Sequence, residues 1–254
     1  MAVTSGVGDI CMHFHLPKPL HGWRALVGEI GIIVVGVLIA LSAEQFAEFV
    51  HDRAQVRHGE EALRDNFRRF VTYTAELDAY APCIAARSAE LRQLIDRSSV
   101  GHQLPNVGPI PQVEARPWQI DTYDAMVASQ AITHVAHGQA ILYSRIAMSA
   151  IDIYDDAKVE WADWGMLASL SGPSRPYDGA EEAQDRLVLA RAVHQDALMR
   201  LIATNTLDRI KRTGLLNDDA FNSATSEGRR MASKMAMCRP IQVGTAPAIG
   251  TSSV

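Results

Sequence analysis

The sequence GEIGIIVVGVLIALSAE, residues 28–44, decides how this chain is organised. Between Glu29 and Glu44 it contains no charged side chain, and Ser42 is its one strongly polar residue. The nine Ile, Val and Leu residues of the run each favour insertion of a helix into a bilayer by about 0.3–0.6 kcal/mol, which sums to about 3–5 kcal/mol. We therefore expect a membrane-inserting helix, and we place this anchor at residues 25–46.

The apolar run is short for a membrane span. Glu29 and Glu44 are fifteen positions apart, which corresponds to about 22 Å of helix, whereas the hydrocarbon core of a bilayer is about 30 Å thick. One carboxylate must therefore lie at or inside the membrane boundary, and we expect Glu29 at the inner edge. A neighbouring helix would relieve this mismatch, and Gly36 with Ala40 forms a small-xxx-small pair that lets a second helix approach closely. These four residues are our candidates for polar and packing contacts in the membrane.

The same run is also compatible with a cleavable signal peptide, whose apolar region is about 7–15 residues long. The small residues between Ala40 and Ala43 would suit a peptidase. Against cleavage, the helical pattern continues past them through Phe46 and Phe49. We therefore favour an uncleaved anchor.

Positive charges near the run predict its orientation. Lys18 and Arg24 precede it, and Arg53 and Arg57 follow it, so the two sides are nearly balanced. Arg24 lies closest to the run, which places residues 1–24 in the cytoplasm by the positive-inside rule. The rest of the chain then lies outside the cytoplasm.

The beginning of the chain also resembles a known group of proteins. The segment HLPKPLHGWR at residues 15–24 is followed by GEIGIIVVGVLIAL at residues 28–41. Together they resemble the opening of a family of uncharacterised proteobacterial single-span membrane proteins. The resemblance implies a single-pass protein of the bacterial inner membrane with a periplasmic helical region, and it implies no activity.

Composition and motifs narrow the functional classes. The 254 residues are 48% hydrophobic and 21% charged, which is enough apolar material for a domain with its own core. The net charge of −5 leaves no basic footprint, so we exclude nucleic acid as a partner. No Gly-x-Ser-x-Gly, His-Glu-x-x-His, Cys-x-x-Cys, phosphate-loop or dinucleotide motif occurs. We therefore expect neither a familiar enzyme nor a bound cofactor.

Apolar residues spaced by seven follow the anchor and predict a long helix with one buried stripe. The stripe consists of Val56, Leu63, Phe70, Leu77, Ile84 and Leu91. Because the companion positions Gly59, Asn66 and Arg87 are poor knobs in a coiled coil, we expect the stripe to pack inside a bundle and place self-association second. Pro82 removes a helical hydrogen bond and should kink or interrupt this helix.

Proline and glycine residues divide the rest of the chain. Residues 98–117 form a Pro-rich loop, and helices are expected over residues 118–137 and 139–171. Another helix starts with Glu181 and Glu182 and ends near Gly214, and the last begins at the cap Asn217. The predicted fold is all-α, with an antiparallel helical bundle over residues 47–239 and a flexible tail over residues 240–254.

The cysteines divide between the two sides of this predicted topology. Cys11 lies in the cytoplasm, whereas Cys83 and Cys238 share the oxidising side. A disulfide between Cys83 and Cys238 and two separate buried thiols fit the sequence equally well.

Several groups have the residue types that bind metal ions. Asp152, Asp155, Asp156, Glu160 and Asp163 share one helix face, which suits a divalent cation or plain solvation, and we favour solvation.

Three histidine-containing groups are weaker candidates for metal sites than the acidic set. Glu48 and His51 form half of a di-iron motif that has no second copy in the chain. A zinc site from His134, His137 and His194, or a clip formed by Cys11, His13 and His15, lacks a supporting ligand cluster. We therefore expect no bound metal.

These observations predict a non-enzymatic interaction or scaffold protein in the bacterial inner membrane. Its expected partners are the lipid bilayer and either a second copy of this chain or another membrane protein. The alternative is an extracytoplasmic sensor domain that binds a small ligand and acts through a membrane partner. A metal-dependent enzyme is a third hypothesis, and it requires stoichiometric metal in the purified protein.

Overall fold

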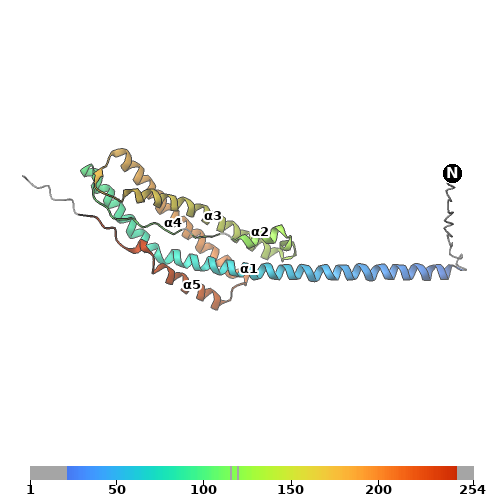
Figure 1. Cartoon of the computed structure of the whole chain (residues 1–254). Helices are drawn as coiled ribbons and strands as arrows, with labels where there is room; N and C mark the ends of the chain where they lie inside the picture. Colours follow the sequence, from blue (N-terminus) through green and yellow to red (C-terminus); the bar gives the residue numbers. More distant parts are fainter. Residues whose placement is uncertain (1–21, 115, 119, 245–254) are drawn as a thin grey trace, which may run out of the picture. The chain divides into compact units, whose positions relative to one another are not determined.

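The structure, a computed structural model, describes residues 22–114, 116–118 and 120–244. It is mostly helical, with 80% helix and 3% strand, which confirms the all-α class. The α-helices are α1 (Trp23–Gly101), α2 (Asp121–Ala128), α3 (His137–Leu167), α4 (Gly179–Thr213) and α5 (Asp218–Ala232). The short elements are the strands β1 (Gln103–Leu104) and β2 (Arg175–Pro176) and 3-10 turns at Ala131–His134, Ala168–Leu170 and Ala236–Cys238. Figure 1 shows how these elements follow one another.

The chain divides into two compact units between His51 and Asp52. We call the described residues 22–51 the apolar unit and residues 52–244 the helical unit. The apolar unit contains only the first part of α1, and none of the side chains described in it is buried. By length and composition, α1 is the one helix in the described part of the chain that qualifies to cross a membrane.

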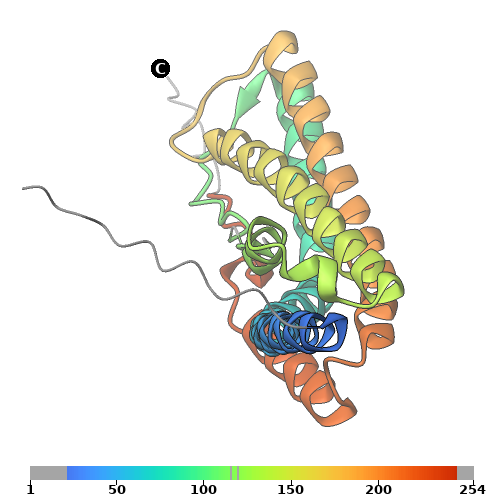
Figure 2. The same ribbon diagram turned by 90° about the vertical axis from the view of Figure 1, so that its right-hand side faces the viewer.

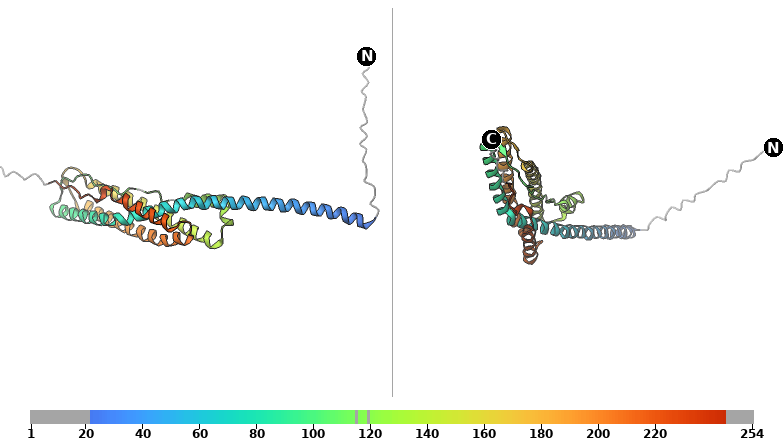
Figure 3. Two further views of the ribbon diagram at one scale, coloured as in Figure 1. Left: turned by 90° about the horizontal axis from the view of Figure 1, so that it is seen from below. Right: turned by 60° about the vertical axis from the view of Figure 1, so that its left-hand side comes forward.

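Pro82 was predicted to kink or interrupt the helix near residues 78–81, and the interruption is wrong, because α1 continues through Pro82. The ribbon instead changes direction inside the helical unit (Figures 1 and 3). Pro82 and Asp78 are exposed, so water can solvate the carbonyl that loses its partner. Thr74 and Ser88 flank the proline and donate to the carbonyls of Phe70 and Ile84 at 2.9 Å and 2.7 Å, contacts that also bend helices.

The core of the helical unit forms around the apolar stripe of α1. Leu63, Phe70, Leu77, Ile84 and Leu91 are at most 3% exposed, which confirms the predicted buried stripe, and only Val56 is half-buried. Figure 2 shows α3 and α4 side by side against this part of α1. Their inward residues join the same cluster, and they include Tyr143, Ile146, Trp164, Leu189, Met199 and Ile210.

Helix α5 packs against α1 at very short range. A Cβ at Gly228 would lie 2.1 Å from the carbonyl oxygen of Thr72 and 2.8 Å from the amide nitrogen of Glu76. Glycine at this position therefore lets the two backbones touch, and any larger residue would force α5 away from α1.

The ends of α4 and α5 agree with the sequence. Asp178 caps α4 by accepting from the amides of Ala180 and Glu181, both at 2.9 Å. Gly214 closes α4 in the left-handed conformation with φ 70°. Asn217 caps α5 by accepting from Ala220 at 2.8 Å, as predicted.

The segment between α1 and α2 is extended where the sequence predicted a loop and the start of a helix. Strand β1 pairs with β2, with Gln103 opposite Pro176. Trp118 packs edge-to-face on Phe70 and Tyr73, with ring centroids 5.3 Å and 5.7 Å apart. These contacts hold Trp118 outside the helix, so the helix predicted from residue 118 shortens to α2 and a 3-10 turn.

The beginning of the predicted flexible tail is paired with the rest of the unit. Val107 bridges Gly172 on one side and Val243 on the other. Gly108 donates to the carbonyl of Gln242 at 2.7 Å, and Gly244 donates to Asn106 at 2.8 Å. The prediction of a free tail from residue 240 is therefore wrong for residues 241–244, because the extended segment supplies hydrogen-bond partners that the sequence did not reveal.

Candidate functional site

The residues predicted to make contacts in the membrane lie in the apolar unit. Glu29, Gly36, Ala40 and Glu44 are all exposed. A side chain added at Gly36 would meet no atom within 4 Å, so space for a neighbouring helix exists there. Ser42 satisfies its hydroxyl internally by donating to the Leu38 carbonyl at 2.7 Å.

The apolar side chains around these four residues are exposed on every side of the helix. Ile32 is 75% exposed, Ile33 65% and Phe46 67%. Apolar side chains exposed on all sides are typical of a helix surrounded by lipid or by another protein, and by length and composition α1 could cross a membrane.

Cys83 and Cys238, which are 155 positions apart in the sequence, form a disulfide with their Cα atoms 4.7 Å apart. One helical turn after Cys83, the buried Arg87 donates to the carbonyls of Met237 and Arg239. The bond therefore joins α1 to the segment after α5, at a point where a buried cation also binds that segment.

The acidic set on α3 is divided by the structure. Asp152 and Asp155 are exposed and Asp156 is half-buried, as the solvation hypothesis requires. Glu160 and Asp163 are only 3% and 0% exposed, so the same hypothesis is wrong for them. The cause is the turn of the helix, which directs the last two carboxyl groups toward α1 and α4.

The histidine groups do not converge on a metal site. His134 lies 3.5 Å from the carboxylate of Asp52, and His194 on α4 is exposed. Glu48 and His51 are exposed in the apolar unit. In the described ranges, no three His, Cys, Asp or Glu side chains are placed to hold a metal. The clip predicted at Cys11, His13 and His15 lies outside the described residues.

Three buried carboxylates in the helical unit have arginine partners. Arg116 donates to Glu76 through Nε at 2.9 Å and through a second nitrogen, and it also contacts Glu114 at 2.8 Å. Arg191 binds Asp163 in the same two-pronged way, with Nε to Oδ2 at 2.7 Å. Arg200 pairs with Asp196 at 2.9 Å. Such pairs compensate the cost of burying a charge.

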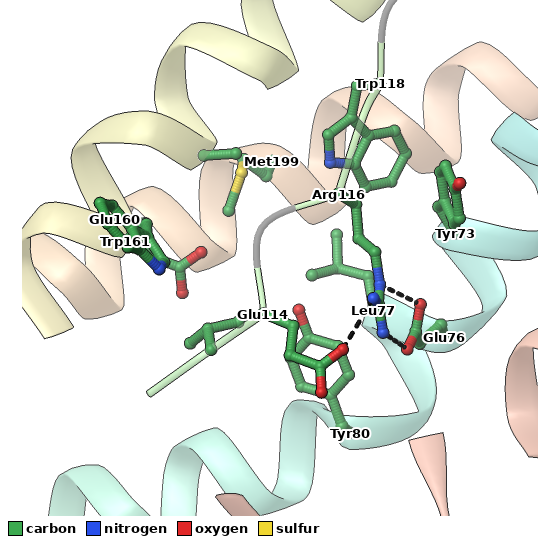
Figure 4. A pocket seen from close by; sticks show the side chains of 12 residues that line it. Tyr73, Glu76, Leu77, Tyr80, Glu114, Arg116, Trp118, Glu160, Trp161 and Met199 are labelled. Carbon is green, nitrogen blue, oxygen red and sulfur yellow. Dashed lines mark hydrogen bonds and ion pairs between the residues drawn. The ribbon is translucent and has the colours of Figure 1, made fainter. Parts of the chain in front are cut away.

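A small cavity lies beside this cluster, between α1, α3, α4 and the extended segment. Its volume is about 20 Å³, which is the space that one water-sized molecule needs. Figure 4 shows aromatic rings and carboxyl groups around it, with the Glu160 carboxyl toward the cavity and the Arg116 guanidinium bound to Glu76. The cavity is too small for an organic substrate.

Burial and neighbouring charges shift the pKa values of several groups here, Asp196 included, and the effects are large at Glu160 and Tyr80. Burial raises the pKa of Glu160 to about 8, and the negative charge of Asp196 acts in the same direction against the hydrogen bond from Trp164. Burial also holds the pKa of Tyr80 well above its ordinary value, with Glu160 and Asp196 as the next causes. Both groups therefore stay protonated in neutral water.

Three open grooves on the surface of the helical unit are larger. The groove between α1 and α5 measures about 430 Å³ and is lined by Arg68, Arg69, Tyr73 and Glu227 among others. A second groove of about 370 Å³ also lies between α1 and α5 and is lined in part by Leu207 of α4. A third groove of about 490 Å³ lies between α3 and α4. None of the three is enclosed, so a ligand bound in any of them would stay partly exposed to solvent.

Family models, curated proteins and solved structures all give no match for this chain. The features of the chain that bear on its function are therefore the exposed apolar unit, the disulfide and the buried polar cluster.

Proposed function

We propose that this protein is a single-pass membrane protein with a helical bundle outside the cytoplasm, and that it acts as an interaction or scaffold module without catalytic activity. The exposure of the apolar unit carries the proposal. From Leu26 to Val50 the large apolar side chains are about half exposed or more, and burying such side chains in lipid contributes about 25 cal/mol for each Å² removed from water.

The disulfide supports an extracytoplasmic helical unit. Disulfides persist in oxidising compartments and are rare in the cytosol. Cys83 and Cys238 both lie after the anchor in sequence, whereas Cys11 precedes it. An N-terminus in the cytoplasm, as the position of Arg24 predicts, keeps the bonded pair on the oxidising side. The resemblance to single-span proteobacterial proteins points to the same topology in a bacterial inner membrane.

The anchor is the surface that we assign to self-association or to another membrane protein. The α1 stripe, which was the other candidate, is buried inside its own chain and unavailable. Glu29 and Glu44 limit the uncharged run to fewer residues than a bilayer needs, and Gly36 with Ala40 offers a close approach. A partner helix placed there would cover the boundary carboxylate.

Membrane extraction tests the anchor directly. We expect the full-length protein to sediment with membranes, to resist alkaline carbonate and to dissolve only in detergent. N-terminal sequencing of the mature protein should find the anchor retained. A freely soluble full-length protein, or a mature form that begins near Glu44, would overturn the proposal.

Cysteine labelling tests the topology. In a Ser223→Cys variant, the new thiol lies on the exposed face of α5, and a membrane-impermeant maleimide should label it in intact spheroplasts. The native Cys11 serves as the internal control, because it should react only after the membrane is opened. Labelling of Cys11 alone in intact spheroplasts would reverse the orientation.

Crosslinking tests the partner. A Cys11→Ser background with Gly36→Cys should form a disulfide-linked dimer in membranes under mild oxidation if two copies associate through the small residues. Leu38→Cys in the same background is the matched control, because it lies about 200° around the helix from residue 36. Equal crosslinking at both positions, or at neither, would argue against an assembly through this face.

A small-ligand sensor remains the second candidate, and the groove between α1 and α5 is the observation that favours it. Its volume of about 430 Å³ falls in the range of small-molecule sites, about 300–1,000 Å³. Arg68 and Arg69 would select an anion, although Arg68 already lies 3.4 Å from Glu227. A thermal-shift panel of organic anions decides this point, because a sensor gains stability with one specific compound.

A further inference from the structure

One buried carboxyl group in the helical unit differs from its neighbours. Glu76, Asp163 and Asp196 are each paired with an arginine. Glu160 is only 3% exposed, yet among the described residues no Arg, Lys or His lies within ion-pair distance of it. In the described part of the chain, its one hydrogen-bond donor is the indole N–H of Trp164, which reaches Oε1 at 3.0 Å.

The groups that face Glu160 supply little compensating charge. Both arginines near it are engaged elsewhere, because Arg116 binds Glu76 and Glu114 and Arg200 binds Asp196. The remaining charges and titratable groups around it are acidic or phenolic. By element, the surrounding groups are Glu76 and Tyr80 on α1, Glu114 and Arg116 on the extended segment, Asp163 on α3, and Asp196 and Arg200 on α4.

An ionised carboxylate in this position would be buried and unpaired. Such a group costs several kcal/mol, and proteins avoid that cost by leaving the group protonated. The cavity beside Glu160 has room for one water-sized molecule, and two of its lining residues, Glu114 and Trp161, are exposed to solvent (Figure 4). A proton therefore has a short path between Glu160 and the solvent.

We propose that Glu160 is a proton-binding site of the helical unit, which holds its proton in neutral water and releases it under mildly alkaline conditions, loosening the packing of α3 against α1 and α4. The pKa of about 8 that burial gives this carboxyl agrees with the geometry. The inference concerns the helical unit alone and does not depend on the apolar unit entering a membrane. With the helical unit outside the cytoplasm, as proposed above, the site would respond to the pH on that side of the membrane.

The sign of the effect follows from linkage. The pKa of Glu160 is raised in the folded state above its ordinary value of 4.5, so the folded protein binds more protons than the unfolded chain between about pH 4.5 and about pH 8. Stability is therefore full below this window and falls as the pH rises through it, and the unfolding equilibrium constant increases up to about tenfold for each pH unit.

The test uses the purified full-length protein in detergent micelles. Urea unfolding of the wild type and of Glu160→Gln is measured from about pH 5 to about pH 9. Gln keeps the acceptor for Trp164 and cannot ionise, so the variant should match the wild type at the acid end and gain stability over it progressively until about pH 8. Asp155→Asn on the exposed face of α3 is the matched control and should leave the pH profile unchanged.

Tryptophan emission gives a second readout that needs no unfolding. Because Trp164 donates to Glu160, ionisation of the carboxyl should change its fluorescence, with a midpoint near pH 8 in the wild type and none in Glu160→Gln. Trp164→Phe should remove the signal. If Glu160→Gln does not fold, the wild-type titration with the Trp164→Phe comparison still decides.

Three outcomes would overturn the proposal. Parallel pH profiles for wild type and Glu160→Gln would show that no proton is exchanged there. A variant less stable than the wild type at alkaline pH would show that the charged form is needed. A fluorescence midpoint that moves with added sodium or magnesium would identify a metal cation as the ligand.

Discussion

Helix α1 has two parts, and the same types of apolar side chain are exposed in one part and buried in the other. Ile33 in the apolar unit is 65% exposed, whereas Ile84 in the helical unit is 2% exposed. The helical unit also buries polar groups, among them Glu76, Arg87 and Asp163, and gives each a partner. The apolar unit has neither a core nor buried polar groups in its described residues.

Apolar residues are therefore arranged differently in the two parts of one continuous helix. In the helical unit, apolar residues recur on one face, because the opposite face meets water. In the apolar unit they occupy all faces, which is the pattern expected of the membrane anchor proposed above. The boundary between the two patterns lies close to the division at residues 51 and 52.

The largest expected effect comes from placing charge in the apolar unit, which tests whether this unit anchors the protein in a membrane. The double substitution Val35→Arg and Leu38→Arg adds about 2.5–3.5 kcal/mol for each arginine at the helix centre, which exceeds the favourable total of about 3–5 kcal/mol. We expect the protein to leave the membrane fraction and to aggregate or be degraded. Quantitative fractionation measures this, with Ala86→Arg on an exposed face of the helical unit as the control. Unchanged membrane retention of the double variant would contradict the anchor.

The second-largest effect is expected from removing the disulfide of the helical unit. Replacing Cys83 and Cys238 by serine removes a crosslink that spans 155 positions, which should lower the free energy of unfolding by about 4–5 kcal/mol on the chain-entropy argument. Chemical denaturation with and without reductant measures it. The double variant should be insensitive to reductant, and a wild type that is equally insensitive would show that the bond adds no stability.

A smaller effect is expected at Gly228, where α5 packs closely against α1. Gly228→Ala places a methyl group against the backbone of α1 and should cost about 1–3 kcal/mol or more through displacement of α5. Gly165→Ala is the matched control, because its new Cβ would meet only the tip of Gln112 at 3.9 Å, and it should stabilise α3 by about 0.5–1 kcal/mol. Thermal unfolding of both variants compares them, and losses of similar size at the two positions would refute this account of α5.

The smallest effect lies on the solvated surface of α3. Lys158 pairs with Asp155 at 2.7 Å, but both side chains are more than half exposed. Lys158→Ala should therefore leave the urea midpoint within experimental error, since exposed ion pairs contribute little. A clear loss of stability would mean that this pair is covered by something in the assembled protein.

The sequence predicted features that depend on neighbours along the chain. The helical class, the buried stripe from Leu63 to Leu91 and the cap at Asn217 each follow from spacing or from one residue type. Local signals of this kind are readable because a helix places residues three, four and seven apart on one face.

Features that depend on distant partners were missed. No residue near Asp163 in the sequence indicates that Arg191 will pair with it from another helix. The burial of Asp163 could therefore not be predicted from the acidic pattern. The pairing of Gln242 and Gly244 with the segment around Val107 likewise joins residues far apart in sequence. Whether Pro82 kinks or interrupts α1 could likewise not be decided from the sequence, because it depends on the exposure of the surrounding turn rather than on the proline itself.

The crosslink between α1 and the segment after α5 also determines how the molecule would carry a mechanical load. A pull applied between the anchor and residues beyond Cys238 would travel along α1 to Cys83 and cross directly through sulfur, bypassing the polypeptide in between. Those 155 positions would otherwise lengthen by on the order of 500 Å when stretched. The disulfide would therefore carry the force, and the helices α2 to α5 would not be stretched.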